Sequence, residues 1–508
     1  MPPKDTDLWI SLKHGQKTRK NGNIKFLQIR YTDVPGRYLA SYISDDNDNF
    51  ESIFRDGAGL DGSSVQGFAD INESDLLLIP DKSTARLVEI MPASNTMVLS
   101  AIADVYRGFG QGRLPKDPRF VPQTMEKYLA ENGLSCQIGA EVECFIFDDI
   151  VLVNADDNKN QDSNYQPKII SVEQYGTGKY PIRRKGGYNA PPFQDSLTEF
   201  RFEVARILKK CYDIDVTNMI HEVASNGQIE INFMHSTLTK AADNVQIYKD
   251  VVRNTAKYHN KVSNFMPKPI FDEVDGSVTG GDNGSGMHVS VSFWDNPSKS
   301  KDVTKKKGNI STNNNIFYDK DDPYAEISQA ARYFIGGLIE HTRSLAAFVT
   351  PTVNSYYRMV PDFEAPIYNT WARGNRSAVV RVPVDQKNNF KSKRIEFRAP
   401  DPSANPYLAF SAIVAAGLDG MKKKMDPGDP VNENIYKMSD SRRKNLGIKS
   451  LPSSLVESLS ELKSDSNYLG ICFDKGLLQT YSVIKEQEIM QIGKDGAKAR
   501  QFMLYYDI

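Results

Sequence analysis

The chain has 508 residues, of which 40% are hydrophobic and 25% charged, and its formal net charge is -1. Because one compact core rarely takes in so many residues, we expect two domains. The near-zero charge argues against a nucleic-acid-binding protein that works by neutralising phosphates, and no segment approaches the ~20 apolar residues that a membrane span requires.

The cysteines and the N-terminus indicate a cytoplasmic protein. Cys136, Cys144, Cys211 and Cys472 show no metal-ligand spacing, and the first two lie in or beside apolar runs. This pattern predicts buried free thiols rather than a disulfide framework. The first twenty residues lack the apolar centre of a signal peptide.

The first part of the chain predicts a small sheet-rich domain. Residues 24–110 alternate short apolar runs with turn signals. Asp117 and Pro118 then predict the start of a helix that ends near Asn132 and Gly133. We therefore expect an α+β fold with an N-terminal domain at 20–112 and a larger domain at 117–508.

The larger domain is predicted to mix strands and helices. A strand is expected at 138–147, followed by a long polar excursion at 151–187. Apolar periodicity predicts three later helices; they span residues 236–265, 324–349 and 405–418. The lysine-rich segment 296–315 is interpreted as a solvated loop rather than a partner-binding site.

Two glutamates mark the predicted strand at 138–147. Glu141 and Glu143 are two residues apart, so both point to the same face. Two like charges there are costly unless a cation bridges them or water solvates them. A metal site and a half-exposed strand with a polar face both remain open from this pattern alone.

The segment HEVASNGQIEIN adds further acids. Asn226 and Gly227 form a tight-turn signal, so a hairpin would bring Glu222 and Glu230 side by side. Mg²⁺ or Mn²⁺ suits such carboxylates, because hard cations prefer oxygen ligands. The alternative is a surface hairpin, which the apolar flanks disfavour.

Two more strands carry polar residues. His288 follows the glycine-rich run NGSGM and is either a ligand or a buried core histidine; its local pattern favours the core histidine. Arg394, Glu396 and Arg398 alternate, so they share a face. Two guanidinium groups around one carboxylate suit a site for phosphate and carboxylate groups, and an ion-pair ladder is the alternative.

Many acids and several arginines therefore lie on strands of one enclosed sheet. Metal ions that bridge ATP phosphates would reconcile these charges, as phosphoryl transfer requires. The chain has no GxxxxGK[ST] loop, which excludes a P-loop enzyme. The sequence thus predicts a metal-dependent enzyme that uses ATP for phosphoryl transfer.

The motifs together resemble those of the bacterial and archaeal type I glutamine synthetases, from about residue 24 to the C-terminal YYDI. The resemblance rests on nine segments in the family's order: GLDGSSVQGFADINESDLLLIPD, EVECFIF, KGGYNAPP, HEVASNGQIEI, FMPKPIF, NGSGMH, VNSYYRMVPDFEAP, NRSAVVR and RIEFRAPDPSANPYLAF.

This resemblance implies a fold, a reaction and an assembly. The fold would be an N-terminal β-grasp domain followed by a catalytic domain with an antiparallel sheet flanked by helices. The reaction would join ammonia to glutamate through γ-glutamyl phosphate at the expense of ATP, in nitrogen assimilation. The assembly would be a dodecamer of two hexameric rings with active sites between subunits, and a nitrogen-regulatory protein is a possible further partner. Neither a nucleic acid nor a membrane is expected as a partner.

The resemblance also implies two or more metal ions per subunit, Mg²⁺ or Mn²⁺. One would be held by Glu143, Glu222 and Glu230, and a second by Glu141, His288 and Glu396. For His288 this replaces the locally favoured core histidine.

Substrate contacts are implied in the same way. Glutamate would contact Asn283, Gly284, Arg358 and Arg398. The nucleotide would contact Ser292, Arg381, Lys391 and Arg394. Arg376 would stabilise the transferring phosphoryl group, and Glu364 would close the site and accept a proton. Asp61, with Ser64 and Tyr188, would form the ammonium pocket and help deprotonate the ammonium ion.

Several positions depart from the family pattern. Ile220 replaces one of a pair of histidines, Thr217 replaces a glutamate, and Ser290 replaces a second histidine. These departures fall on the nucleotide side and concern adenine and ribose contacts more than the reaction. Tyr436 lies near a tyrosine that some members adenylylate, within poorly matching surroundings. Asp70 replaces a feedback-inhibition arginine, which disfavours that inhibition.

Two other functions remain as alternatives. A ligase of the same fold could attach a different amine to glutamate, which would require an altered ammonium pocket. A non-catalytic assembly or nitrogen-sensing partner could keep the fold, but loss of metal ligands would be expected there and none is lost.

Overall fold

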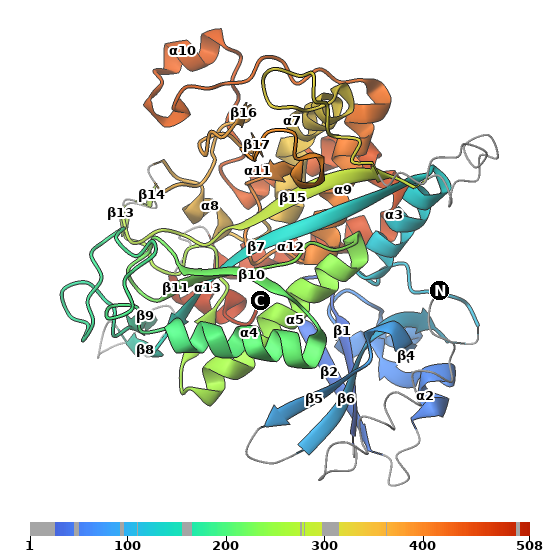
Figure 1. Cartoon of the computed structure of the whole chain (residues 1–508). Coiled ribbons are helices and arrows are strands. Elements are labelled where there is room, and N and C mark those ends of the chain that lie inside the picture. Colours follow the sequence, from blue (N-terminus) through green and yellow to red (C-terminus); the bar gives the residue numbers. More distant parts are fainter. Residues whose placement is uncertain are drawn as a thin grey trace. The chain divides into compact units, whose positions relative to one another are not determined.

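The computed structural model describes residues 26–44, 50–91, 96–108, 110–154, 165–274, 277–278, 280–296, 314–361, 363–493 and 498–508. These residues form two units, each with its own sheet (Figure 1). One unit contains the described residues up to Phe120 together with Arg206–Ile214, and the other contains Val121–Ala205 and Asp215–Ile508. Most of the predicted loop at 296–315 lies outside the described residues.

The smaller unit is built on a mixed sheet in the order β2-β1-β6-β4-β3, with β5 also paired to β6. Its strands are β1 (Phe26–Thr32), β2 (Tyr38–Ser44), β3 (Ala58–Asp61), β4 (Asp75–Pro80), β5 (Arg86–Met91) and β6 (Thr96–Arg107). β1 runs parallel to β6, and the other pairs are antiparallel. Buried Leu27, Ile29 and Leu78 form part of its core, which confirms the sheet-rich first region. The short helix α2 (Glu51–Asp56) packs against β4.

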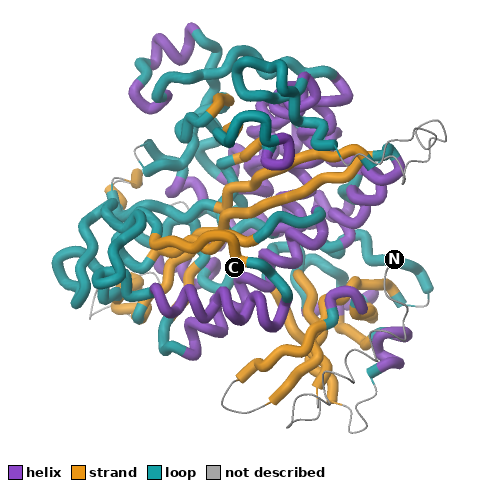
Figure 2. The backbone as a smooth tube through the Cα atoms, viewed as in Figure 1, coloured by secondary structure: helices purple, strands orange, loops and turns teal. Residues whose placement is uncertain are grey.

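The larger unit is built on a long sheet in the order β10-β11-β7-β15-β18-β17-β16, and β12 also pairs with β7. Its strands are β7 (Leu134–Phe147), β10 (Val216–His221), β11 (Gln228–Phe233), β12 (Val262–Asn264), β15 (Met287–Asp295), β16 (Trp371–Arg373), β17 (Val380–Val382) and β18 (Ile395–Phe397). Only the β16–β17 pair is parallel among these described strands. The long strands β7 and β15 run side by side (Figures 1 and 2).

Helices accompany this sheet, as predicted. They are α3 (Phe120–Glu131), α4 (Thr198–Tyr212), α5 (Leu238–Tyr258), α7 (Gln329–Val349), α8 (Ser355–Arg358), α9 (Pro406–Lys423), α10 (Asp440–Asn445), α11 (Leu455–Ser464), α12 (Lys475–Ile492) and α13 (Lys498–Tyr505). The residues of α4 from Arg206 onward belong to the smaller unit. α5 packs on β7 and α9, and α7 packs on α9. Glycines allow the α7–α9 approach, since a Cβ on Gly337 would lie 2.2 Å from the Ala416 carbonyl oxygen. None of the described helices is long and apolar enough to cross a membrane.

Several predicted helix boundaries were wrong by a few residues. α5 ends at Tyr258 rather than 265, because Asn260 adopts a left-handed conformation (φ 52°) and the chain then enters β12. α7 begins at Gln329 rather than 324, where the Ser328 side chain accepts a hydrogen bond from the Ala331 N–H. α3 begins at Phe120, after a turn at Asp117. α9 continues beyond 418 to Lys423.

The polar excursion at 151–187 contains more regular structure than predicted. β8 (Asp149–Asn154) and β9 (Tyr165–Ile170) form a two-stranded antiparallel sheet. A second small sheet joins β13 (Glu273–Val274) and β14 (Ser277–Val278). All four cysteines are free, and three of them are buried; Cys211 is half-buried.

Candidate active site

Strand register brings the predicted acids together at the centre of the larger sheet. On β7, Glu143 lies opposite Glu230 of β11. Two residues earlier, Glu141 lies opposite His288 of β15. On the far side of β15, Ser290 lies opposite Glu396 of β18. Side-chain alternation and this register together create two adjacent clusters of possible metal ligands.

The first cluster consists of Glu143, Glu222 and Glu230. One ligand oxygen from each lies within 4.8 Å of the others, and Glu143 and Glu230 are buried. Burial, followed by repulsion from neighbouring carboxylates, raises the pKa of Glu143 well above its usual value and that of Glu230 to about 8. Burial raises the pKa of Glu222 to about 7. Three carboxylates that cannot all be charged without a cation fit a divalent metal ion.

Backbone and amide groups fix two of these carboxylates. Gly286 N–H and the Gln228 side-chain amide donate to Glu143 Oε2 at 2.8 and 3.2 Å. The Asn232 amide donates to Glu230 Oε1 at 2.7 Å. One oxygen on each side chain is therefore held by the protein, which orients the carboxylate toward the shared cluster.

The hairpin that joins β10 to β11 differs from its prediction. Glu222 N–H donates to the Gln228 carbonyl at 2.9 Å, so residues 222–227 form a longer loop and not a two-residue turn at Asn226 and Gly227. Gly227 ends the loop in a left-handed conformation (φ 80°). Glu222 and Glu230 nevertheless meet in one cluster, as expected of the hairpin.

The second cluster consists of Glu141, His288 and Glu396, again with ligand atoms within 4.8 Å of one another. His288 Nδ1 lies 3.4 Å from Glu141 Oε2. Burial, followed by the nearby Arg398 guanidinium, lowers the pKa of His288 well below its usual value. A neutral imidazole among carboxylates is a suitable ligand for a divalent cation.

Two arginines contact Glu396, but they are not the predicted pair. Arg398 Nη1 donates to Glu396 Oε1 at 3.0 Å, and Arg381 of β17 donates to the other oxygen. Arg394 instead donates to Asp385 at 2.8 Å. The prediction failed because alternation gives the face of a strand and not the partner on the next strand.

A pocket of about 650 Å³ opens over both clusters. The predicted glutamate and phosphoryl residues that line it are Asn283, Gly284, Arg358, Arg376 and Arg398, with Glu364 and Tyr188 beside them. Arg358 is buried and donates to the Ala399 carbonyl at 2.8 Å. Gly284 is required by a close approach, since a Cβ there would lie 2.5 Å from the Pro267 carbonyl oxygen.

Glu364 lies in a strained loop at this pocket. Its φ is 65°, which is uncommon for a residue with a side chain and occurs often at functional sites. Its Oε2 accepts a hydrogen bond from the Asn283 amide at 3.2 Å. The centroid of the neighbouring Phe363 ring lies 3.4 Å from Lys268 Nζ, and the Tyr436 hydroxyl donates to the Ala365 carbonyl at 2.8 Å.

A second pocket of about 420 Å³ gathers most of the expected nucleotide residues. Ser292, Lys391 and Arg394 line it, as do the departing positions Thr217 and Ser290. The third departing position, Ile220, lines the main pocket instead. The fourth expected nucleotide residue, Arg381, contacts Glu396. Glu141 lines both pockets, so the second cluster lies where they adjoin.

Asp61 and Ser64 belong to the smaller unit. Ser63 Oγ and Ser64 Oγ each donate to the Asp61 carboxylate at 2.7 Å. These hydrogen bonds lower the pKa of Asp61, the bond from Ser63 being the larger cause. The side chain is thus an exposed, ionised carboxylate that can attract a cation.

Sequence reasoning missed several residues of the main pocket. Lys185 and Phe363 line it, as do Asn232 and Gln228, which hold two of the carboxylates. Gln228 and Asn232 each lie two residues from Glu230 on β11, so the two-residue period places all three side chains on the same face. The alternation of β11 could therefore have identified them.

Comparison of the chain with known proteins identifies its family. The family of the glutamine synthetase catalytic domain matches residues 115–501, and that of the glutamine synthetase beta-Grasp domain matches residues 23–108. The chain is 42% identical over 472 residues to a glutamine synthetase from Sulfolobus acidocaldarius, covering 92% of this chain and 93% of that protein. It is 38% identical over 508 residues to one from Mycolicibacterium smegmatis, covering 97% and 98%.

A solved structure agrees with these relatives. A cryo-EM structure of Plasmodium falciparum glutamine synthetase is similar with a TM-score of 0.78 at 26% identity, and the match covers 96% of each chain. The predicted α+β class, β-grasp domain and family are confirmed. The chain therefore belongs to the glutamine synthetase family, in its bacterial and archaeal type I group, and is a glutamate–ammonia ligase.

Proposed function

We propose that the two clusters hold two divalent ions, Mg²⁺ or Mn²⁺, between a glutamate site in the main pocket and an ATP site in the second pocket. One observation carries this proposal: Glu141 lines both pockets and belongs to a cluster of three ligands. Bound divalent ions would neutralise the charge of the ATP phosphates and of the transferring phosphoryl group.

The chain's own residues would then position the reactants. Asn283, Gly284, Arg358 and Arg398 would hold glutamate, and Ser292, Arg381, Lys391 and Arg394 would hold the nucleotide. A γ-carboxylate oxygen of glutamate attacks the γ-phosphorus of ATP, and ADP leaves. Arg376, which is exposed at the main pocket, would stabilise the charge on the transferring group.

The second half of the reaction requires a proton acceptor. Ammonium must lose a proton before it can attack the carbonyl carbon of γ-glutamyl phosphate and release phosphate. Asp61, with Ser64 and Tyr188, would bind the ammonium ion and help to deprotonate it. Glu364 would accept a proton and close the pocket against water.

The assembly and location are part of the same proposal. Family resemblance supports a dodecamer of two hexameric rings, in which Asp61 of one subunit serves the pocket of its neighbour. It also supports a cytoplasmic enzyme. A nitrogen-regulatory protein would be a further partner of such an enzyme, whereas the poorly matching sequence around Tyr436 disfavours adenylylation there.

The metal assignment is tested by counting Mn²⁺ ions in purified variants. Glu396→Ala and the isosteric Glu396→Gln should lower the stoichiometry by one ion per chain and abolish turnover. Glu230→Ala should remove the other ion. Glu488→Gln is a matched control, because Glu488 is a buried carboxylate bonded to Lys485; it should retain both ions. Full metal content and turnover in Glu396→Gln would refute the assignment.

A further inference from the structure

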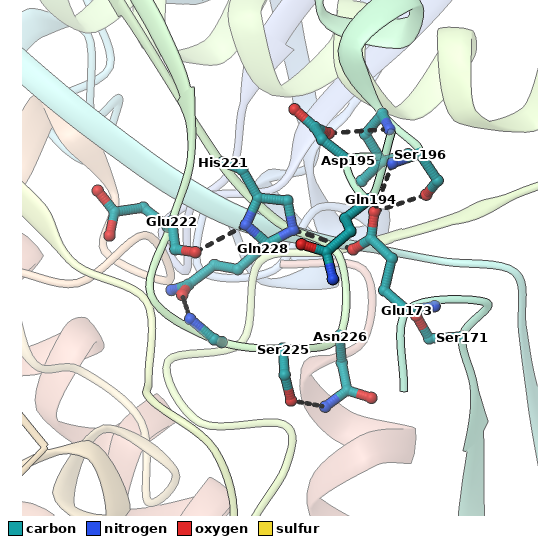
Figure 3. A network of polar contacts seen from close by, with 12 residues as sticks. Ser171, Glu173, Gln194, Asp195, Ser196, His221, Glu222, Ser225, Asn226 and Gln228 are labelled. Carbon is teal, nitrogen blue, oxygen red and sulfur yellow. Dashed lines mark hydrogen bonds and ion pairs between the residues drawn. The ribbon is translucent and has the colours of Figure 1, made fainter. Parts of the chain in front are cut away.

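A chain of buried polar contacts lies behind Glu222 (Figure 3). His221 ends β10 and is 1% exposed, and Glu173 follows β9 and is 0% exposed. His221 Nε2 lies 2.9 Å from Glu173 Oε2, and its Nδ1 lies 2.7 Å from the main-chain carbonyl oxygen of Glu222. Neither residue lines the main pocket.

The chemistry of these contacts fixes the orientation of the imidazole ring. A carbonyl oxygen has no hydrogen to donate, so His221 Nδ1 carries the hydrogen of that bond. The other ring nitrogen then shares a hydrogen with the Glu173 carboxylate. A ring held at both nitrogens cannot flip without losing both bonds, and its buried partners would be left unsatisfied.

Glu173 is itself held from the opposite side. Its Oε1 accepts hydrogen bonds from Ser196 N–H at 2.8 Å and Ser196 Oγ at 2.6 Å. One carboxylate oxygen is therefore bonded to Ser196 and the other to His221, as Figure 3 shows. The Glu173 carboxylate therefore connects Ser196 to His221 at the end of β10.

The Glu222 peptide is also confined by neighbouring backbone. A Cβ on Gly187 would lie 2.3 Å from the Glu222 carbonyl oxygen. Gly187 N–H donates to the Val223 carbonyl at 3.1 Å, and Val223 N–H donates to Glu222 Oε2 at 3.0 Å. Rotation of the Glu222 peptide would break the His221 bond and move this side-chain oxygen.

We propose that Glu173 and His221 are positioning residues that orient Glu222 toward the metal ion of the first cluster. The proposal rests on the proposed role of Glu222 as a metal ligand. Glu173 holds His221, His221 holds the Glu222 carbonyl, and the fixed peptide directs the side chain toward Glu143 and Glu230. Mutation of a group that orients a metal ligand in this way typically lowers metal affinity by about 10–100-fold.

The proposal predicts a selective loss of affinity. Glu173→Gln should weaken one of two Mn²⁺ sites about 10–100-fold and leave the other unchanged, measured by direct Mn²⁺ binding to metal-free protein. The Mn²⁺ concentration for half-maximal activity should rise by a similar factor, and excess Mn²⁺ should restore most of kcat. Ser196→Ala, which keeps the backbone bond to Glu173, should produce a smaller change of the same kind.

A matched control separates positioning from general stability. His341 is another buried histidine, held by Asp465 at 2.8 Å and Asp419 at 2.9 Å, and it lines neither pocket. Asp465→Asn should lower the thermal midpoint and leave both Mn²⁺ affinities unchanged.

Two outcomes would overturn the proposal, and they are distinguishable. Unchanged Mn²⁺ affinities in Glu173→Gln, or equal weakening of both sites, would show that Glu173 does not position Glu222. Glu222→Gln is measured in parallel. If that variant also binds Mn²⁺ normally, the assignment of Glu222 as a ligand fails, and the positioning role fails with it.

Discussion

At the centre of the larger sheet, three neighbouring glutamates are costly to ionise without a bound cation. Glu143 and Glu230 are buried and Glu222 is half-buried beside them; burial raises the pKa of all three, and repulsion from nearby carboxylates raises it further. A folded protein without metal therefore retains protons on these groups at pH values where an unfolded chain has lost them. A bound cation removes this conflict, because it favours the charged carboxylates.

This conflict predicts how stability depends on pH in metal-free protein. The pKa values of about 7 for Glu222 and about 8 for Glu230 lie above the ordinary value of 4.5. Stability should therefore fall as pH rises from about 5 to about 8, by an amount on the order of a few kcal/mol. Chemical denaturation across this range, with chelator and with saturating Mg²⁺, measures it. Saturating Mg²⁺ should remove the decline, and a flat profile with chelator would contradict the prediction.

For single residues, the sequence predicted on which face of a strand a side chain lies better than it predicted which residue that side chain contacts. The two-residue spacing placed Glu141 and Glu143 on one face, as observed. The same rule could not decide whether His288 was a ligand, since a core histidine has the same spacing. It also could not show that Arg394 turns to Asp385, because that contact depends on the loop between two strands.

At the scale of elements, the loop that carries Glu364 is held at successive residues. The side-chain nitrogens of Lys268 and Lys185 lie 3.4 and 4.3 Å from the centroid of the Phe363 ring. Glu364 accepts a bond from Asn283, and the Ala365 carbonyl accepts one from Tyr436. Regular strands were predictable from alternation, whereas these contacts join segments far apart in the chain and leave no local pattern.

We expect Tyr436→Phe to loosen this loop without changing its shape. Loss of one hydrogen bond costs about 1 kcal/mol, so the equilibrium constant for closing the loop should fall by a few-fold. Water should then reach γ-glutamyl phosphate more often, and ATP hydrolysis without ammonium should rise relative to glutamine formation. The ratio of phosphate to glutamine measures this leakage. Tyr468→Phe removes a buried hydroxyl that contacts Ser344 and serves as the control; an unchanged ratio in Tyr436→Phe would refute the prediction.

At the scale of the whole molecule, the proposed reaction depends on both units of the chain. Asp61 lies in the smaller unit, and the metal clusters and Glu364 lie in the larger one. Nine motifs in family order allowed this division of roles to be predicted, although no local pattern around Asp61 indicates catalysis. The assembly itself is a property of several chains, which one sequence predicts only through its family.

Mixed assemblies test whether subunits share active sites. Asp61→Ala and Glu364→Ala should each abolish most activity alone. When the two variants are dissociated and reassembled together, some sites receive an intact residue from each subunit, so part of the activity should return. Separately reassembled variants are the control. No recovery in mixed assemblies of normal size would contradict sites shared between subunits.

The proposed reaction joins ammonium, rather than a larger amine, to a glutamate activated by ATP. The most direct measurement is phosphate release with Mg²⁺, ATP and glutamate, run against ammonium and a panel of primary amines. We expect ammonium to give the highest kcat/KM, with one glutamine formed per phosphate. Phosphate release that depends on an amine but not on ammonium would contradict it.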